Sequence, residues 1–169
     1  EGLLDKARCS LARFLGADAG DLVFVSNATS GVNAVLRSLR FRPGDEVLVT
    51  DHEYNACRNA VEFAAAQSRA RVVVARVPFP LRRAEQITEA VLSAVTSHTR
   101  LALLDHVTSQ TGLVLPIERL VRELDERGAR VGGVAHSGEG LGTVGEDPRH
   151  AGERGHVVDD CRRAEETLD

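Results

Sequence analysis

Short apolar runs of strand length alternate with segments whose apolar residues recur at helical spacing, and this alternation leaves few folds open to the chain. The strand-length runs are residues 22–25, 46–50, 71–77, 101–104 and 130–134. The segments with helical spacing are residues 3–15, 31–39, 55–67, 85–95 and 117–127. Apolar strands that alternate with amphipathic helices are typical of a parallel sheet covered on both faces. We therefore predict an α/β fold.

The pattern stops after Val134. Residues 135–169 carry 9 acidic and 4 basic residues and no aromatic residue. Their large aliphatic residues are only Leu141, Val144, Val157, Val158 and Leu168. So few apolar side chains cannot offset a backbone ordering cost of about 1–2 kcal/mol per residue. We predict a folded domain over residues 1–134 and a disordered tail, rich in glycine and charge, over residues 135–169.

Composition argues against several classes of protein. The chain is 43% hydrophobic and 27% charged, which is ordinary for a globular domain. No apolar run approaches 18 residues, so we expect no membrane span. The net charge of −4 argues against a nucleic-acid partner. The cysteines Cys9, Cys57 and Cys161 are far apart and in no metal-ligand spacing, which predicts a cytoplasmic protein without a disulfide framework or a metal site.

Polar residues follow the predicted strands, at the edge of a parallel sheet where ligands bind. The first such segment, residues 26–31, precedes a predicted helix and is rich in small residues. Free backbone N–H groups at a helix N-terminus favour an anion of phosphate size. The alternative is a helix cap without a ligand, made by Asn27 or Thr29.

The next strand-end segments offer aromatic rings and hydroxyl groups. His52 or Tyr54 could stack on a flat cofactor, although a solvated loop would look the same. A metal site from Asp51, His52 and Glu53 is disfavoured because sequential neighbours rarely point at one ion. Residues 105–112 carry hydroxyl groups and an amide that could hold a substrate. The last strand-end segment is residues 133–136.

A structural interpretation competes with the functional one for three other residues. Asp105 and His106 suggest an acid–base pair, but adjacent residues on a strand face opposite ways, so one of the two is expected to be structural. Cys57 could be a nucleophile, but its helical spacing favours a small core residue.

Three long segments resemble one enzyme family. They read DLVFVSNATSGVNAVLRSL, PGDEVLVTDHEYNACRNAVEF and LALLDHVTSQTGLVLPIERLV. Between about Leu3 and Val134 the chain resembles the class V aminotransferase superfamily of pyridoxal-phosphate-dependent, fold type I enzymes. The similarity is greatest to isopenicillin N epimerase-like proteins, with cysteine desulfurases more distant. The resemblance implies the first part of the large domain, a parallel-sheet α/β sandwich of the pyridoxal-phosphate-dependent transferase type.

The resemblance also implies roles for individual residues. The cofactor phosphate would receive donors from Ala28 and Thr29. His52, or else Tyr54, would lie against the pyridine ring. Thr108 and Ser109 would lie near the ring's phenolic oxygen or the substrate, and His136 matches a histidine of the family's fifth strand. Gln110 stands where the most similar relatives are expected to have proline, which is a departure from the family pattern.

Two other departures concern the groups that make the cofactor reactive. Gly133 occupies the position of the aspartate that pairs with the pyridine nitrogen in the family. The family's Schiff-base lysine has no counterpart, since Lys6 is the only lysine and lies on the first helix. We therefore assign no catalytic residue and expect non-covalent cofactor binding at best. The chain is interpreted as an inactive fragment or degenerate copy of a transferase or isomerase that acts on amino acids, homodimeric in its intact form.

Two alternatives remain. One is a non-catalytic domain that binds a phosphate ligand or a homologous subunit. The other is an unrelated nucleotide-binding α/β domain, which is disfavoured because neither G-x-G-x-x-G nor G-x-x-x-x-G-K follows the first predicted strand.

Overall fold

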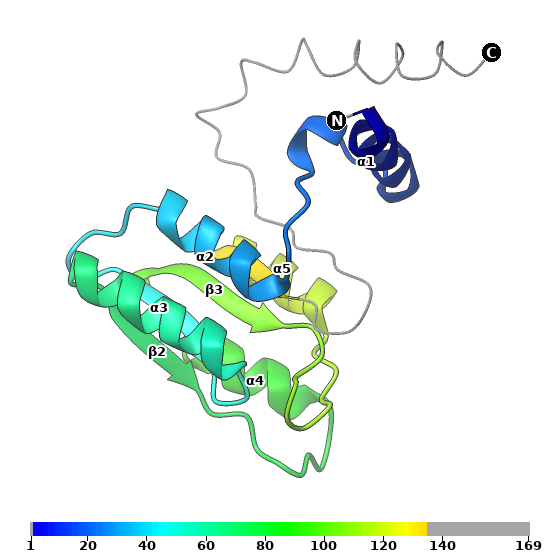
Figure 1. Cartoon of the computed structure of the whole chain (residues 1–169). Coiled ribbons are helices and arrows are strands. Elements are labelled where there is room, and N and C mark those ends of the chain that lie inside the picture. The colour runs from blue at the N-terminus through cyan, green and yellow to red at the C-terminus, as the bar shows by residue number, and fades with distance from the viewer. Residues whose placement is uncertain (1, 135–169) are drawn as a thin grey trace. The chain divides into compact units, whose positions relative to one another are not determined.

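The computed structural model describes residues 2–134, which fall into two compact units, residues 2–25 and residues 26–134 (Figure 1). The predictions for the tail, including His136, lie outside the described residues. No helix in the described part of the chain is long and apolar enough to cross a membrane.

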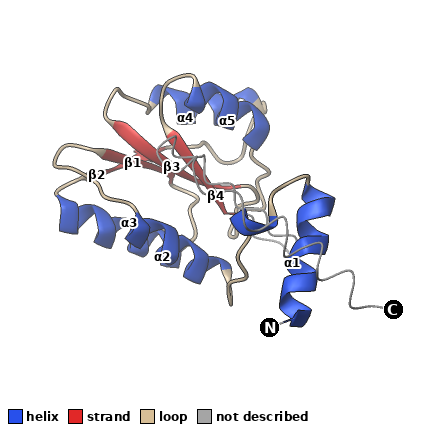
Figure 2. Cartoon of the chain, turned by 90° about the horizontal axis from the view of Figure 1, so that it is seen from above, coloured by secondary structure: helices blue, strands red, loops and turns tan. Residues whose placement is uncertain are grey.

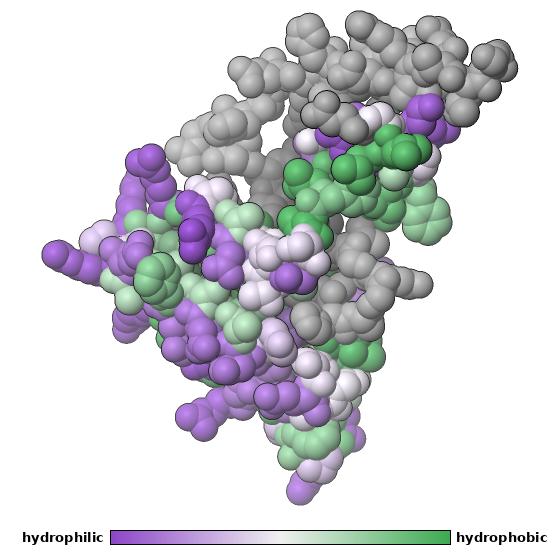
Figure 3. Space-filling view, viewed as in Figure 1, coloured by the Kyte–Doolittle hydropathy of each residue, from purple (hydrophilic) through white to green (hydrophobic). Residues whose placement is uncertain are grey.

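The first unit is a helix followed by one short turn of 3₁₀ helix. Helix α1 (Gly2–Leu15) ends at Gly16, whose φ of +64° is the left-handed conformation that glycine favours at a helix C-terminus. Helix η1 (Ala19–Asp21) is capped by Asp18, whose carboxylate accepts a hydrogen bond from the amide of Gly20 at 2.8 Å. Several large hydrophobic side chains of this unit remain exposed, and they form the green surface around α1 in Figure 3.

The prediction of a strand at residues 22–25 is wrong. This segment has no strand structure, and Val23 is 85% exposed. Phe24 and Val25 are about half exposed, at 52% and 51%. An apolar run becomes a strand only when a neighbouring strand takes up its backbone hydrogen bonds. Residues 2–25 contain no second strand that could do so.

The second unit contains a four-stranded parallel sheet, which confirms the predicted fold class. The sheet consists of β1 (Glu46–Thr50), β2 (Arg71–Ala75), β3 (Thr99–Asp105) and β4 (Arg130–Val134). Their spatial order is β2-β1-β3-β4, and all neighbours run parallel. Leu48 of β1 lies opposite Val73 of β2 and Ala102 of β3. The strand ends that follow Thr50 and Asp105 therefore meet at one edge of the sheet.

Helices cover both faces of this sheet (Figure 2). Helices α2 (Ala28–Ser38) and α3 (Asn55–Ser68) lie on one face, and α4 (Glu85–Ser93) and α5 (Ile117–Asp125) on the other. Alternate strand residues supply the two cores. The core under α2 and α3 contains Val47, Val49, Leu101 and Leu103. The core under α4 and α5 contains Leu48, Ala102 and Leu104.

A buried carboxylate fixes the start of β1. Glu46 is 1% exposed, accepts a hydrogen bond from the Thr96 hydroxyl at 2.5 Å, and forms an ion pair with Arg71. The hydrogen bond from Thr96 and the interaction with Arg71 hold the pKa of Glu46 below its ordinary value, against the effect of burial. This cluster links β1 to the first residue of β2 and to the turn before β3.

The cysteines divide into two environments. Cys57 is free and fully buried in the core under α2 and α3, which confirms its interpretation as a small core residue. Cys9 of α1 is also buried, in the small cluster that it forms with Ala12 and Ala19.

Candidate functional site

The candidate site lies at the carboxyl ends of β1 and β3, which are neighbouring parallel strands. Residues 50–55 follow β1, and residues 105–112 lie at and beyond the end of β3. The sequence placed His52 in the first segment and Thr108 in the second without predicting any contact between them. The structure brings these two residues together.

A third residue, Thr111, connects His52 to Thr108. His52 Nδ1 lies 3.0 Å from Thr111 Oγ1, and Thr111 Oγ1 lies 2.8 Å from Thr108 Oγ1. The second ring nitrogen, His52 Nε2, lies 2.9 Å from the carbonyl oxygen of Val77. The imidazole is therefore tied both to the loop after β3 and to the segment after β2. Sequence reasoning gave Thr111 no role, because nothing local distinguishes it from the other hydroxyl residues of its segment.

The two candidate rings have different surroundings. His52 has a side chain that is 12% exposed and takes part in the network just described. Tyr54 caps the start of α3 and packs, half-buried, against the core under α2 and α3. His52 is hydrogen-bonded to the loop that carries Thr108. The sequence did not make this distinction.

The N-terminus of α2 fits both interpretations that the sequence left open. Asn27 is the cap, and its side-chain oxygen accepts a hydrogen bond from the amide of Ser30 at 2.8 Å. The cap uses one of the free amides in the first turn. Within the part of the chain that the structure describes, the amides of Ala28 and Thr29 donate no hydrogen bond. Capping by Asn27 therefore leaves two donors at the positive end of the helix for an anion.

The hydroxyl of Thr29 has a neighbour inside the chain. It lies near the thiol of Cys57, on α3, and acts to lower the pKa of this thiol. Burial, with smaller contributions from the nearby carboxyl groups of Glu53 and Asp105, raises the pKa of Cys57 to about 11. Cys57 is thus a protonated thiol at neutral pH and a poor nucleophile. It links the first turn of α2 to the first turn of α3.

Two buried carboxyl groups lie behind these residues. Glu53 is 6% exposed and Asp105 is fully buried. Burial and the neighbouring carboxyl group of Asp105 together raise the pKa of Glu53 to about 9, against weaker effects of the Tyr54 amide and Arg58. Glu53 is therefore protonated at neutral pH, beside the carboxyl group of Asp105. Sequence reasoning missed this pair, because its members are distant in the chain and meet only where the strands pair.

The same geometry decides between Asp105 and His106. Asp105 is buried beside Glu53, whereas His106 is exposed. The two side chains do not form the acid–base pair that the sequence suggested, and Asp105 is the structural member. Ser109 is exposed, one residue beyond the buried Thr108. Of the three neighbours that were considered for a metal, Asp51 and His52 both contact the backbone of Val77, whereas Glu53 is buried near Asp105.

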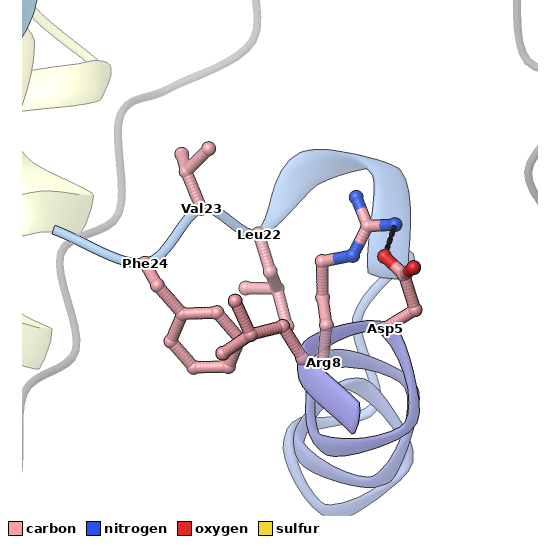
Figure 4. Close-up of a pocket in the computed structure, with 6 residues that line it drawn as sticks. Asp5, Arg8, Leu22, Val23 and Phe24 are labelled. Atoms are coloured by element: carbon pink, nitrogen blue, oxygen red, sulfur yellow. Dashed lines mark hydrogen bonds and ion pairs between the residues drawn. The ribbon is translucent and has the colours of Figure 1, made fainter. Parts of the chain in front are cut away.

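A separate hollow lies in the N-terminal unit (Figure 4). Its volume is about 180 Å³, and it is lined by Leu4, Asp5, Arg8, Leu22, Val23 and Phe24. Arg8 and Asp5 form an ion pair at its rim, with 3.0 Å between Nη2 and Oδ1. The hollow is smaller than the roughly 300–1,000 Å³ of most ligand sites, and none of its residues belongs to the predicted site.

Comparisons with known proteins agree with this arrangement. The family model for aminotransferase class-V matches residues 2–132. The isopenicillin N epimerases of Streptomyces clavuligerus and Amycolatopsis lactamdurans are 38% and 40% identical, each over 75% of this chain and 32% of their own length. The probable chloroplastic L-cysteine desulfhydrase of Arabidopsis thaliana is 32% identical, over 70% of this chain and 28% of its own length. The chain thus spans about a third of the length of these relatives.

Solved structures show the same fold. The cystine C-S lyase C-DES, in complex with its reaction product cysteine persulfide, superposes with a TM-score of 0.71 and 25% identity. The superposition covers 80% of this chain and 36% of the lyase. Since the family model spans most of the residues given, and the parallel sheet has the expected strand-end segments, the chain belongs to the class-V aminotransferase family.

Proposed function

We propose that residues 26–134 bind the phosphate and pyridine ring of pyridoxal 5′-phosphate, as part of an enzyme that acts on amino acids. The observation that carries this proposal is the joining of two strand-end segments that the sequence identified separately, beside the N-terminus of α2. Thr29 at the start of α2 contacts Cys57 on α3, and His52 is linked to Thr108 through Thr111. A variant of C-DES with glycine covalently linked to its PLP cofactor superposes with a TM-score of 0.70 and 25% identity, which supports the choice of cofactor.

The phosphate is assigned to the N-terminus of α2. The amides of Ala28 and Thr29 supply two donors there, and the helix dipole favours a negative charge. The hydroxyl of Thr29 lies near the thiol of Cys57, so we assign the phosphate to the two amides rather than to this hydroxyl. The residues present therefore fit a phosphate group.

The pyridine ring is assigned to the face of His52, with Tyr54 as the alternative. Thr108 is buried within the hydrogen-bond network, so its hydroxyl holds the loop in place. Ser109 is exposed and is the better candidate for a contact with the ring's phenolic oxygen or with the substrate. His136 lies outside the described residues, and its role rests on the resemblance alone.

When bound, the cofactor supplies an electron sink for bonds at the α-carbon of an amino acid. Two groups that would make use of this sink are missing from the residues given. Gly133 stands at the aspartate position, and Lys6 is the only lysine. We therefore propose that this 169-residue chain binds the cofactor without covalent attachment and is inactive alone. Isomerase or transferase activity, a homodimeric assembly and a cytoplasmic location stay predictions for the intact form.

Replacing Ala28 by proline tests the phosphate assignment directly. Ala28 is the first residue of α2, where proline is tolerated, and Asn27 before it is already extended, at φ −166° and ψ 168°. Ala28→Pro removes one amide donor and keeps the helix. Ala28→Gly is the matched control, because it shortens the side chain and keeps the amide. We expect pyridoxal phosphate to bind Ala28→Pro roughly two- to tenfold more weakly than the control.

Equal affinity of the two variants would contradict the phosphate assignment. Binding of inorganic phosphate without any contribution from the ring would favour the non-catalytic, phosphate-binding alternative. Treatment of the cofactor complex with borohydride separately tests the proposal that the cofactor is not covalently attached. Mass spectrometry should find no adduct on Lys6, and an adduct there would overturn non-covalent binding.

A further inference from the structure

The hydrogen-bond partners of His52 determine which ring nitrogen carries the proton. A backbone carbonyl can only accept, so Nε2, 2.9 Å from the Val77 carbonyl oxygen, carries the hydrogen. In the neutral ring Nδ1 is then an acceptor. Its partner at 3.0 Å, the hydroxyl of Thr111, must donate to it. His52 is therefore held as the Nε2–H tautomer.

The rest of the network has only one consistent direction. Because Thr111 donates its hydrogen to His52, its oxygen accepts from the hydroxyl of Thr108, 2.8 Å away. The oxygen of Thr108 in turn accepts a hydrogen bond from the amide of Leu113 at 2.8 Å. In the series of hydrogen bonds that runs from the Leu113 amide to the Val77 carbonyl, the donor and the acceptor of each bond are therefore fixed. A network with one arrangement holds its members more firmly than one with several.

The backbone around Thr111 is itself fixed. The amide of Thr108 donates to the carbonyl of Leu113, and the amide of Gly112 donates to the carbonyl of Thr108, both at 2.9 Å. Val107 and Val114 form an antiparallel bridge across this turn. Gly112 takes a φ of +64°, which permits the tight turn directly after Thr111. The hydroxyl of Thr111 is therefore carried by a turn whose backbone is fixed by hydrogen bonds.

We propose that Thr111 is a positioning residue that holds His52 as the Nε2–H tautomer with Nδ1 occupied. Both nitrogens then have partners within the chain, so His52 offers its ring face to a flat ligand and no nitrogen for proton transfer. The ligand part of this inference rests on the proposed cofactor function. Phe79 contributes to the placement of the imidazole by an edge contact, with 6.0 Å between ring centroids and 61° between ring planes.

The tautomer can be read by ¹⁵N NMR of the histidine rings in the full chain, without cofactor. The spectra are recorded near pH 8.5, where an imidazole of ordinary pKa, about 6.5, is neutral. His52→Asn identifies the signals of His52 among those of the six histidines. We expect the Nε2–H tautomer in the unmodified chain. Thr111→Val, which keeps the shape and removes the hydroxyl, should move the Nδ1 resonance downfield, and Thr111→Ser should restore it.

An Nδ1–H tautomer in the unmodified chain would overturn the inference. So would Thr111→Val if it left the ring resonances unchanged. The ligand part is tested by titration with pyridoxal phosphate, for which Thr111→Val should bind roughly two- to tenfold more weakly and Thr111→Ser normally. If the ring resonances respond as expected but no variant binds pyridoxal phosphate, the positioning role of Thr111 stands and the proposed function fails.

Discussion

Burial and the neighbouring carboxyl group of Asp105, the last residue of β3, raise the pKa of Glu53, which follows the adjacent strand β1. The same two carboxyl groups contribute to the raised pKa of Cys57, and Arg58 is the cation that acts on Glu53 through its charge. The pair joins the loop that carries His52 to the loop that carries Thr108. The protonation of this pair also predicts how the free energy of unfolding depends on pH.

The stability of the chain should fall as pH rises between about 4.5 and 9, because of Glu53. The pKa of Glu53 is raised to about 9 in the folded chain from an ordinary 4.5. The folded state therefore keeps a proton that the unfolded state releases, and the free energy of unfolding decreases by up to about 1.4 kcal/mol per pH unit. Glu53→Gln should remove this slope. Urea unfolding at several pH values measures it.

Glu62→Gln is the control for that experiment. Glu62 lies on α3, its side chain is half exposed, and it pairs with Arg58. The control should keep the slope of the unmodified chain. A slope that survives in Glu53→Gln would place the titrating group elsewhere.

Glu46 should give a pH dependence of the opposite sign. Its pKa is lowered by the hydrogen bond from Thr96 and by Arg71, so its contribution is present above the ordinary carboxyl pKa and is lost as pH falls through the lowered value. We expect Glu46→Gln to cost about 1–3 kcal/mol near pH 7, the range for a hydrogen-bonded buried charge, and less in acid. Glu89→Gln, in the exposed pair with Arg83, should cost much less. Equal losses would contradict the role of Glu46 at the start of β1.

Cys57 should react slowly with thiol reagents in the folded chain. Its pKa is raised to about 11 and its side chain is fully buried. With so small a thiolate fraction, alkylation near pH 8 should be more than tenfold slower than for an ordinary cysteine. Mass spectrometry of peptides after timed labelling measures the rate, and labelling in guanidinium gives the unfolded reference. Rapid labelling of the folded chain would show that α2 and α3 leave Cys57 accessible.

Residues 22–25 and the sheet should respond differently to substitution. Val23 is 85% exposed, so Val23→Ser should change the free energy of unfolding by less than about 0.5 kcal/mol. Leu104 is fully buried between β3 and the helices α4 and α5, so Leu104→Ala should cost about 2–5 kcal/mol. Chemical unfolding of both variants makes the comparison. A large loss for Val23→Ser would restore the strand that the sequence predicted.

The local pattern of apolar residues was sufficient to predict the strands of the sheet and the helices that cover it. The apolar runs at residues 46–50 and 101–104 became neighbouring strands, and the alternation of inward-facing residues follows from their spacing. It was insufficient at residues 22–25, because strand formation also depends on a partner strand. Cys57 was predicted as a core residue from spacing alone and is one.

The candidate site was predictable only residue by residue. His52 and Thr108 stand out as polar residues after apolar strands, and this could be read from the sequence. Their connection could not, because it passes through Thr111 and depends on the side-by-side pairing of β1 and β3. The same holds for Glu53 and Asp105. Contacts between residues far apart in the chain depend on which strands become neighbours, and local periodicity carries no information on that order.

The order β2-β1-β3-β4 has a consequence for the energetics of any ligand at this edge. The atoms that hold His52 come from the segment after β2 and the loop after β3, so they converge only when both outer neighbours of β1 have assembled on it. A ligand held by this arrangement has no binding site in a partly assembled sheet. Occupancy and cooperative unfolding are therefore thermodynamically linked, and a ligand present at a hundred times its Kd should raise the unfolding free energy by about 2.7 kcal/mol.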